Sequence, residues 1–213
     1  MTADIRVMTA GAPLQRAKVA VVLLHGRGGT AEDILGLAAA LAVPDVAYLA
    51  PQAAGNTWYP LSFLAPIDRN EPSLSRALAT VGTVIDAARE AGLAIGRLVL
   101  MGFSQGGCLA LEYVARNARR YGAVAGLSAG LIGPPGTPRD YAGSLAGTPA
   151  FLGCSDVDAH IPLQRVQEST RVLQGLSATA TERIYPGMPH TINADEIARV
   201  RAMLAGIPAA KAA

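Results

Sequence analysis

Short apolar runs alternate along the chain with longer stretches in which apolar residues recur every three to four positions. A continuous apolar run rich in β-branched residues is typical of a buried strand, whereas the wider spacing is typical of an amphipathic helix. The runs predict strands at 5–8, 18–24, 46–50, 97–101, 122–127, 149–152 and 179–185. The spaced stretches predict helices at 31–41, 74–91, 105–117, 163–176 and 192–204.

Strands that alternate with helices usually form a mostly parallel sheet with helices on both faces. The sequence therefore predicts an α/β fold. Its 213 residues contain no internal repeat and are expected to form one domain, residues 1–213. In such a sheet the chemistry is expected at the carboxyl ends of the strands.

Composition narrows the class of protein. Hydrophobic residues make up 51% of the chain and charged residues 16%, which favours a large core over disorder. The net charge is +2 and no run of basic residues forms a nucleic-acid patch. The longest apolar stretch, residues 19–24, is too short to cross a bilayer, and the N-terminus lacks the apolar core of a signal peptide. With only two cysteines, a disulfide framework is not expected. A reduced, cytoplasmic setting is expected instead.

The pattern Gly102-x-Ser104-x-Gly106 stands between a predicted strand and a predicted helix. This is the setting of a nucleophile elbow, a sharp turn that exposes the serine hydroxyl at the end of the sheet. Residues two before and two after the serine must lack side chains there, and glycine meets that requirement. Ser104 is therefore the candidate nucleophile.

A serine hydroxyl needs a base within hydrogen-bond reach, and imidazole is the usual one. The chain has three histidines. His190 follows the last predicted strand and precedes the last helix, where the base of a hydrolase belongs; it is the predicted base. His160 is the rival, with a role lining the site or bonding backbone as the alternative. His25 is expected to bond loop backbone beneath the site.

The base needs an acid that accepts its Nδ1–H and fixes its tautomer. Asp156 and Asp158 both follow the strand that ends near Gly153. Asp156 lies nearer the strand end, where the loop is best anchored, and is preferred as the acid. Asp158 is expected instead to bond within its own turn.

The developing negative oxygen of the transition state needs N–H donors. One is the backbone N–H of Gln105, directly after the nucleophile. The second is expected from the loop 25–29, read as HGRGG, through the backbone of Arg27. The Arg27 side chain could also meet an anionic substrate group, although a surface role is more usual. Cys108, one helical turn after Ser104, is expected to be a small buried hydrophobe.

The long irregular stretch 51–72 carries three aromatic residues, Trp58, Tyr59 and Phe63. A loop of that length in a compact domain is usually functional, and these aromatics are predicted to wall an apolar substrate cleft. The alternative is that Trp58 and Phe63 anchor the loop to the body of the protein. The two interpretations do not exclude each other.

Four motifs together resemble the bacterial phospholipase/carboxylesterase family of α/β-hydrolases, which also includes acyl-protein thioesterases. They are GFSQGG at 102–107, HGRGG at 25–29, the Gly153-x-x-Asp156 loop with Ile161-Pro162, and Gly187-x-x-His190. Trp-Tyr-Pro at 58–60 and Asn-Glu-Pro at 70–72 resemble the small esterase-like branch in particular.

The resemblance implies an α/β-hydrolase fold, a triad of Ser104, Asp156 and His190, oxyanion donors from the backbone of Arg27 and Gln105, and neither metal nor organic cofactor. Acyl-protein thioesterases usually have leucine where this chain has Arg27. That difference makes the mouth of the cleft more polar and argues against a long acyl group as the natural substrate.

The sequence therefore predicts a serine hydrolase that cleaves small-molecule carboxylic esters through an acyl-enzyme. The alternatives are an acyl thioesterase, which needs the same machinery, and a hydrolase fold used only as a binding module. No triad member is missing, which argues against the binding module. Apolar helix faces leave a homodimer open; nucleic acid and stable membrane insertion are not expected.

Overall fold

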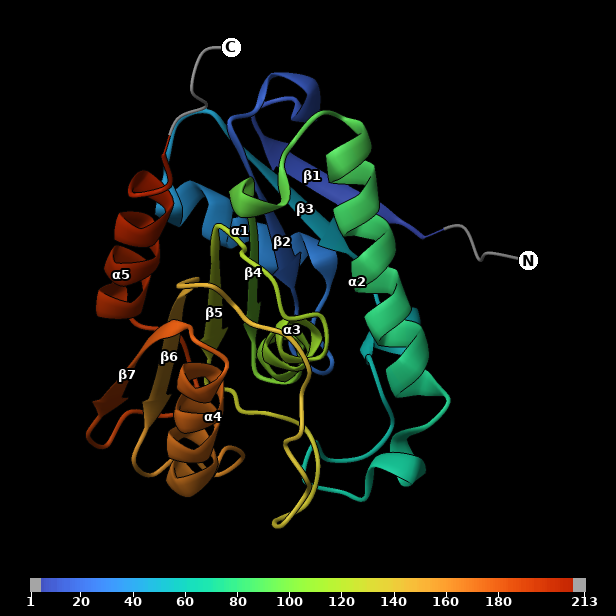
Figure 1. The fold of residues 1–213 in the computed structure, drawn as a ribbon, viewed down its shortest axis with the longest axis vertical. Helices are drawn as coiled ribbons and strands as arrows, with labels where there is room; N and C mark the ends of the chain where they lie inside the picture. The colour runs from blue at the N-terminus through green and yellow to red at the C-terminus, as the bar shows by residue number, and fades with distance from the viewer. Residues whose placement is uncertain (1–4, 209–213) are drawn as a thin grey trace.

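The computed structural model describes residues 5–208; residues 1–4 and 209–213, the ends of the predicted domain, lie outside them. The described residues form a seven-stranded sheet in the order β1-β3-β2-β4-β5-β6-β7 (Figure 1). All neighbouring strands are parallel except β1, which runs antiparallel to β3. The strands are β1 (Val7–Gly11), β2 (Val19–Leu24), β3 (Val46–Pro51), β4 (Leu98–Phe103), β5 (Ala123–Leu127), β6 (Pro149–Ser155) and β7 (Thr179–Tyr185).

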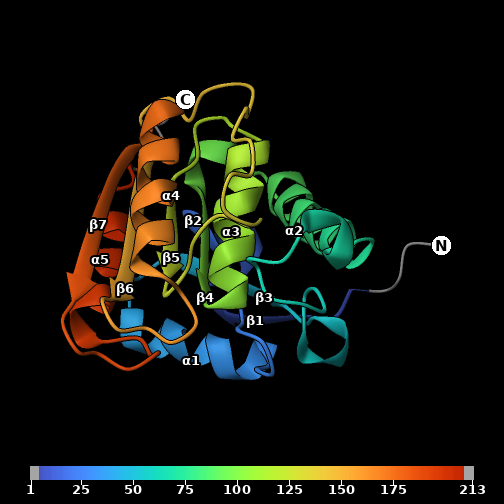
Figure 2. The ribbon, with the colours of Figure 1, turned by 90° about the horizontal axis from the view of Figure 1, so that it is seen from below.

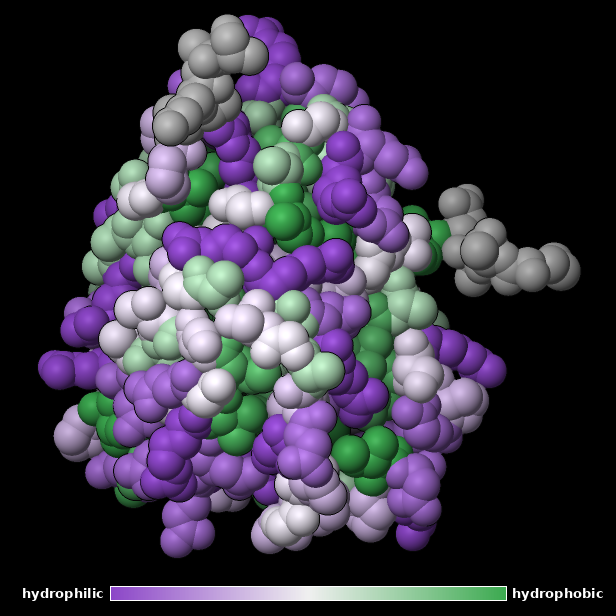
Figure 3. Space-filling view, viewed as in Figure 1, coloured by the Kyte–Doolittle hydropathy of each residue, from purple (hydrophilic) through white to green (hydrophobic). Residues whose placement is uncertain are grey.

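Helices cover both faces of the sheet, which confirms the predicted α/β fold (Figure 2). Helices α2, α3 and α4 pack on one face, and α1 and α5 pack on the other. The face that carries α2–α4 mixes hydrophilic and hydrophobic residues on its outer surface (Figure 3). The helices are α1 (Ala31–Leu41), α2 (Ser73–Glu90), α3 (Gln105–Arg116), α4 (Leu163–Gly175) and α5 (Ala194–Ala205).

Strand β2 shows why continuous apolar runs were the right signal for the sheet. Successive side chains of a strand point to opposite faces. Ala20, Val22 and Leu24 accordingly join the core under α2–α4, while Val19, Val21 and Leu23 join the core under α1 and α5. Because helices cover both faces, every position of the strand must be apolar, and all six are buried.

Helix α1 begins where its sequence predicts. The hydroxyl of Thr30 accepts the N–H of Asp33 at 3.0 Å, and the Asp33 carboxylate accepts the N–H of Thr30 at 2.9 Å. This reciprocal capping box satisfies two of the donors that a helix start leaves without partners. The cap fixes the chain direction directly after the loop 25–29, which contributes to the site described below.

The first predicted strand, 5–8, was placed too early: the strand is Val7–Gly11 and lies at the sheet edge. The stretch 51–72 is irregular as predicted, interrupted by two 3-10 turns, Ala54–Asn56 and Ile67–Asn70. None of the helices formed by residues 5–208 combines the length and apolar composition that crossing a bilayer requires.

Helix α5 also starts with a capping box, and one of its members is deeply buried. The Glu196 carboxylate accepts the N–H of Asn193 through Oε2 at 2.8 Å, while Oε1 has no partner among the described residues. A Cβ on Gly153 of β6 would overlap this carboxyl group, so Glu196 sits directly against the sheet. Burial raises the pKa of Glu196 to about 7, and the hydrogen bond from Asn193 only partly offsets it.

Replacing Glu196 by glutamine is expected to stabilise the protein at pH 8 by about 1–3 kcal/mol. When the pKa of a carboxyl group is higher in the folded protein than in the unfolded chain, the protein is most stable with that group protonated. Its stabilisation is present below about pH 4.5 and is lost as the pH rises through about 7. Urea unfolding should therefore separate Glu196→Gln from the parent at pH 8 and hardly at pH 5. Glu182→Gln, which removes an exposed carboxylate on β7, serves as control. A gain in stability at pH 8 in Glu182→Gln, or no gain in Glu196→Gln, contradicts the prediction.

Candidate active site

Ser104 lies on a sharp turn between β4 and α3. Its backbone has φ 53° and ψ −121°, a conformation rarely adopted by residues with a side chain. A Cβ on Gly102 would overlap the backbone of Gly106, and a Cβ on Gly106 would overlap the backbone of Leu24. The two glycines are thus required by close contact, as predicted. The Ser104 hydroxyl does not cap α3, and Ser104 lines the cavity described next.

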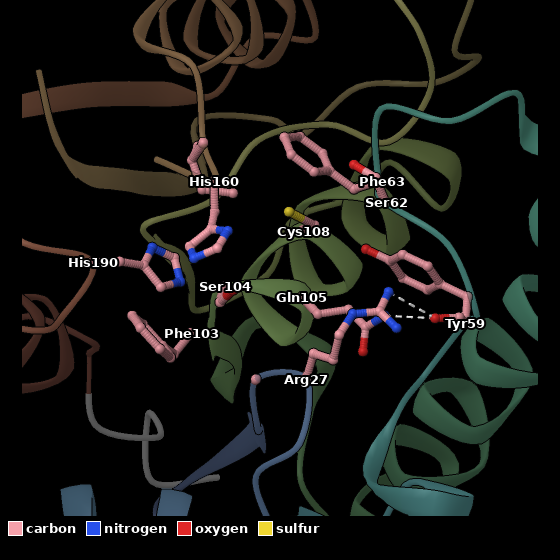
Figure 4. A pocket seen from close by; sticks show the side chains of 12 residues that line it. Arg27, Tyr59, Ser62, Phe63, Phe103, Ser104, Gln105, Cys108, His160 and His190 are labelled. Carbon is pink, nitrogen blue, oxygen red and sulfur yellow. Dashed lines mark hydrogen bonds between the residues drawn. The ribbon is translucent and has the colours of Figure 1, made fainter. Parts of the chain in front are cut away.

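A cavity of about 450 Å³ opens over Ser104 at the carboxyl ends of the parallel strands (Figure 4). It combines aromatic and aliphatic walls with a few polar groups, the composition expected of a small-molecule site. The residues that line it are Gly26, Arg27, Tyr59, Ser62, Phe63, Phe103, Ser104, Gln105, Cys108, His160, Ile161 and His190. Within residues 5–208 no three His, Cys, Asp or Glu side chains gather as a set of metal ligands.

His190, on the loop after β7, is held by a buried carboxylate. Its Nδ1 lies 2.7 Å from Oδ2 of Asp158, whose side chain is fully buried. The other oxygen of Asp158 accepts the backbone N–H groups of His160 at 2.8 Å and of Ile161 at 3.0 Å. With Nδ1 committed to Asp158, the Nε2 side of the ring faces the cavity that Ser104 also lines, without a direct hydrogen bond between the two.

The preference for Asp156 as the acid was wrong. Asp156 is exposed, and its Oδ1 accepts the N–H of Gly187 at 2.8 Å, so it tethers the loop that carries His190 without touching the imidazole. Asp158 does bond within its own turn, as predicted, but with one oxygen only. A carboxylate has two oxygens, and the turn aims the second at His190.

The surroundings of Asp158 keep it ionised. Burial opposes the charged form, but the hydrogen bonds from His190 and from two backbone N–H groups outweigh burial, and the pKa of this carboxyl is lowered. The thiol of Cys154 also approaches Oδ2, at 3.7 Å. An ionised, fully buried carboxylate at Nδ1 is suited to stabilise an imidazolium when His190 takes up a proton.

His190 is packed between two rings. Phe103 lies on one side with 4.8 Å between ring centroids, and His160 meets the ring edge-on at 4.8 Å. His160 therefore lines the cavity beside His190, as its alternative interpretation proposed, and Asp158 contacts its backbone and not its ring. The contacts fix the plane of the His190 imidazole, which a proton carrier requires.

Two candidate backbone N–H donors lie near Ser104, on Gln105 and on Arg27. Gln105 is the first residue of α3, where the helix leaves its N–H groups without internal partners. Arg27 lies in the glycine-rich loop after β2, outside any helix or strand. Both residues line the cavity (Figure 4). The structure thus brings together the two residues predicted to supply oxyanion donors.

His25 is a structural residue, as predicted. Its Nδ1 lies 2.8 Å from the carbonyl of Gly26, and its Nε2 accepts the N–H of Ala53 at 3.1 Å. Because Nε2 accepts a hydrogen bond, the proton of the neutral ring resides on Nδ1. Burial lowers the pKa of His25, which favours this neutral form. The ring thereby ties the loop after β2 to the loop after β3.

The three aromatic residues divide between the two roles considered for them. Tyr59 and Phe63 line the cavity. Trp58 does not: its indole stacks at 5.0 Å from His25, and its Nε1–H donates to the carbonyl of His25 at 2.8 Å. Trp58 is an anchor of the loop, and its prediction as a substrate-binding residue was wrong. An indole with one polar N–H fits a buried site only where that N–H finds an acceptor.

Cys108 lies at the floor of the cavity, one helical turn after Ser104. Burial raises the pKa of its thiol to about 12. A thiol is a nucleophile only as the thiolate, so Cys108 does not compete with the serine. Both cysteines are buried and free.

Comparison with known proteins supports a hydrolase. The model of the family described as phospholipase/carboxylesterase matches residues 7–207. A crystal structure of a phospholipase/carboxylesterase from Dyadobacter fermentans DSM 18053 superposes with a TM-score of 0.91 at 45% sequence identity, over 95% of this chain and 97% of that one.

Curated relatives include two fungal proteins named acyl-protein thioesterase 1. The protein from Gibberella zeae is 29% identical over 121 residues, and the match spans 54% of this chain and half of that protein's length. The protein from Cryptococcus neoformans is 24% identical over 222 residues, which are 90% of this chain and 93% of that protein.

Proposed function

Because this chain belongs to the phospholipase/carboxylesterase family and is a hydrolase, we propose that it cleaves carboxylic esters with Ser104 as nucleophile, His190 as base and Asp158 as orienting acid. The observation that carries the proposal is the 2.7 Å contact between His190 Nδ1 and the buried Asp158, in the cavity that exposes Ser104. An imidazole oriented by a buried carboxylate beside a nucleophile elbow is the arrangement that a general base requires.

The geometry supports the following sequence of steps. The Ser104 hydroxyl attacks the ester carbonyl while Nε2 of His190 accepts its proton. Asp158 stabilises the resulting imidazolium, and the N–H groups of Arg27 and Gln105 stabilise the tetrahedral oxyanion. His190 then protonates the departing alcohol. Water, activated by the same imidazole, releases the acid from the acyl-enzyme and restores Ser104.

The acyl group is proposed to lie against Tyr59 and Phe63, in the cavity that Cys108 and Ile161 also line. These side chains offer apolar contacts without an acidic group, which suits an uncharged acyl chain. The substrate is therefore expected to be a small-molecule ester.

Thioester cleavage is the second candidate. The curated relatives named acyl-protein thioesterases favour it, and the same nucleophile, base and oxyanion donors cleave both bonds. The two candidates differ in leaving group, which is an alcohol in one case and a thiol in the other.

A matched series of substrates tests the function. Nitrophenyl esters and acyl thioesters with acyl chains of two to twelve carbons would be compared by kcat/KM, with intact-mass detection of the acyl-enzyme. We expect a mass increase equal to the acyl group and higher kcat/KM for esters. Faster turnover of thioesters throughout would select the second candidate. Absence of turnover and of any adduct would contradict both.

A further inference from the structure

The loop that walls the cavity accepts four of the five N–H groups of the Arg27 side chain. We call residues 57–61 the wall segment. The two terminal nitrogens of a guanidinium carry four N–H groups, and the wall segment supplies four acceptors for them. These acceptors are the Thr57 hydroxyl at 3.0 Å and the carbonyls of Pro60 at 2.9 Å, Tyr59 at 3.0 Å and Leu61. The guanidinium therefore holds a loop, and its role as a receptor for an anionic substrate group is not supported.

The side chain of Gln105 also binds the wall segment. Its Nε2 donates to the carbonyl of Tyr59 at 2.8 Å. Its Oε1 accepts the N–H of Trp58 at 3.0 Å and the hydroxyl of Thr57 at 3.2 Å. The dashed lines in Figure 4 end together on the Tyr59 carbonyl, which accepts from both Arg27 and Gln105.

The two residues that bind the wall segment are also those proposed to donate their backbone N–H groups to the oxyanion. Arg27 stands among Gly26, Gly28 and Gly29, and glycine gives a backbone unusual conformational freedom. Other contacts tie this loop to the same region: the N–H of Gly28 donates to the carbonyl of Asn56 at 2.8 Å. Without such restraints a glycine-rich loop does not hold an N–H group in one direction.

We propose that the side chains of Arg27 and Gln105 clasp the wall segment and so position the oxyanion donors, making the cavity wall and the oxyanion site one mechanical unit. This inference rests on the proposed function. Arg27 then has two separate parts: its backbone N–H contacts the reacting oxygen, and its side chain is a positioning group. A misdirected donor lowers transition-state stabilisation more than substrate binding, because the oxyanion forms only after attack.

Arg27→Met tests the clasp, since it keeps an unbranched, flexible side chain and removes the guanidinium with its hydrogen bonds. With a nitrophenyl ester we expect kcat to fall about 10- to 100-fold and KM to change less than about threefold, below the 10²–10³-fold loss typical when a donor is removed outright. Arg201→Met is the matched control. Arg201 likewise donates to two carbonyls, of Leu41 and Ala40, but far from the cavity, and its loss should leave kcat unchanged.

A transition-state analogue separates positioning from general damage. An alkyl trifluoromethyl ketone adds to a nucleophilic serine and places a negative oxygen in the oxyanion site. Its inhibition constant should rise in Arg27→Met by about the same factor as kcat/KM falls. An inhibition constant equal to that of the parent, with kcat/KM reduced, overturns the positioning role.

The only tryptophan of the chain, Trp58, reports on the wall segment independently of activity. It is 4% exposed, so acrylamide should quench it poorly in the parent and more strongly in Arg27→Met. Unchanged quenching overturns the clasp whether or not the protein is an esterase. Absence of ester turnover in the parent, with increased quenching in the variant, would instead contradict the proposed function and leave the clasp standing.

A double-mutant cycle with Gln105→Met tests whether the two side chains act on one segment. If they do, the second substitution finds the segment already released, and the combined loss in kcat is smaller than the product of the single losses. A combined loss in kcat equal to the product of the two single losses would show that the side chains act independently. That result would overturn the proposal that they hold one segment together.

Discussion

Replacing Asp158 by asparagine is expected to lower kcat/KM for a nitrophenyl ester about 10³- to 10⁴-fold. The amide can turn its NH₂ toward His190, which then keeps its proton on Nε2 and can no longer accept one from Ser104. It also removes the charge that stabilises the imidazolium. Circular dichroism and a urea midpoint near that of the parent would show that the loss is chemical, since the turn oxygen of residue 158 is retained.

Asp156→Asn is the matched control for that experiment. The exposed side chain of residue 156 keeps an oxygen that can accept the N–H of Gly187, so the His190 loop should stay in place. We expect kcat/KM within about fivefold of the parent, as for a surface substitution that keeps its hydrogen bond. If Asp156→Asn is inactive and Asp158→Asn is active, the acid must be reassigned.

Ser104→Ala is expected to remove ester hydrolysis by at least about 10⁴-fold and to abolish covalent labelling by a fluorophosphonate. No other side chain at the cavity floor replaces the hydroxyl, because the thiol of Cys108 is held protonated by its raised pKa. Intact-mass measurement after incubation with the reagent detects labelling directly.

Ser128→Ala is the matched control for the nucleophile. Ser128 follows β5 as Ser104 follows β4, also has a positive φ, and is buried with no partner for its hydroxyl among the described residues. Its removal should leave labelling and turnover intact. Labelling that persists in Ser104→Ala and disappears in Ser128→Ala would move the nucleophile to the neighbouring strand.

The apolar pattern predicted the sheet and its helices well because burial on both faces leaves little freedom. Strand β7 and helix α3 begin where the pattern places them. The edge strand β1 was misplaced, since one of its edges is unpaired and its partly exposed residues form no continuous apolar run. Element type follows from burial, whereas the ends of an edge strand depend on its partner.

The site was predictable where a residue is fixed by backbone geometry and not where two similar residues share a loop. The turn at Ser104 requires Gly102 and Gly106, which the sequence shows directly. The chain has only three histidines, so few candidates compete with His190 as the base. The choice between Asp156 and Asp158 depended on which carboxylate the turn directs inward. A signal was present: an aspartate whose turn uses the N–H groups two and three residues on leaves one oxygen free.

The role of the Arg27 side chain could not be predicted from the sequence, because its hydrogen-bond acceptors lie about thirty residues away in an irregular loop. Irregular segments carry no periodicity that could place their carbonyls. Trp58 was misassigned for the same reason: only the fold shows that its indole faces His25 and not the cavity.

The clasp on the wall segment makes contact mostly with main-chain carbonyls, those of Tyr59, Pro60 and Leu61. A carbonyl is present whatever the side chain, so an exchange at Tyr59, which lines the cavity, can reshape it while the guanidinium keeps its acceptors. Exchanges at residues 59 and 63, which both line the cavity, are therefore expected to change its shape without disturbing the proposed catalytic groups, which makes this loop the natural place to redirect the enzyme toward new substrates.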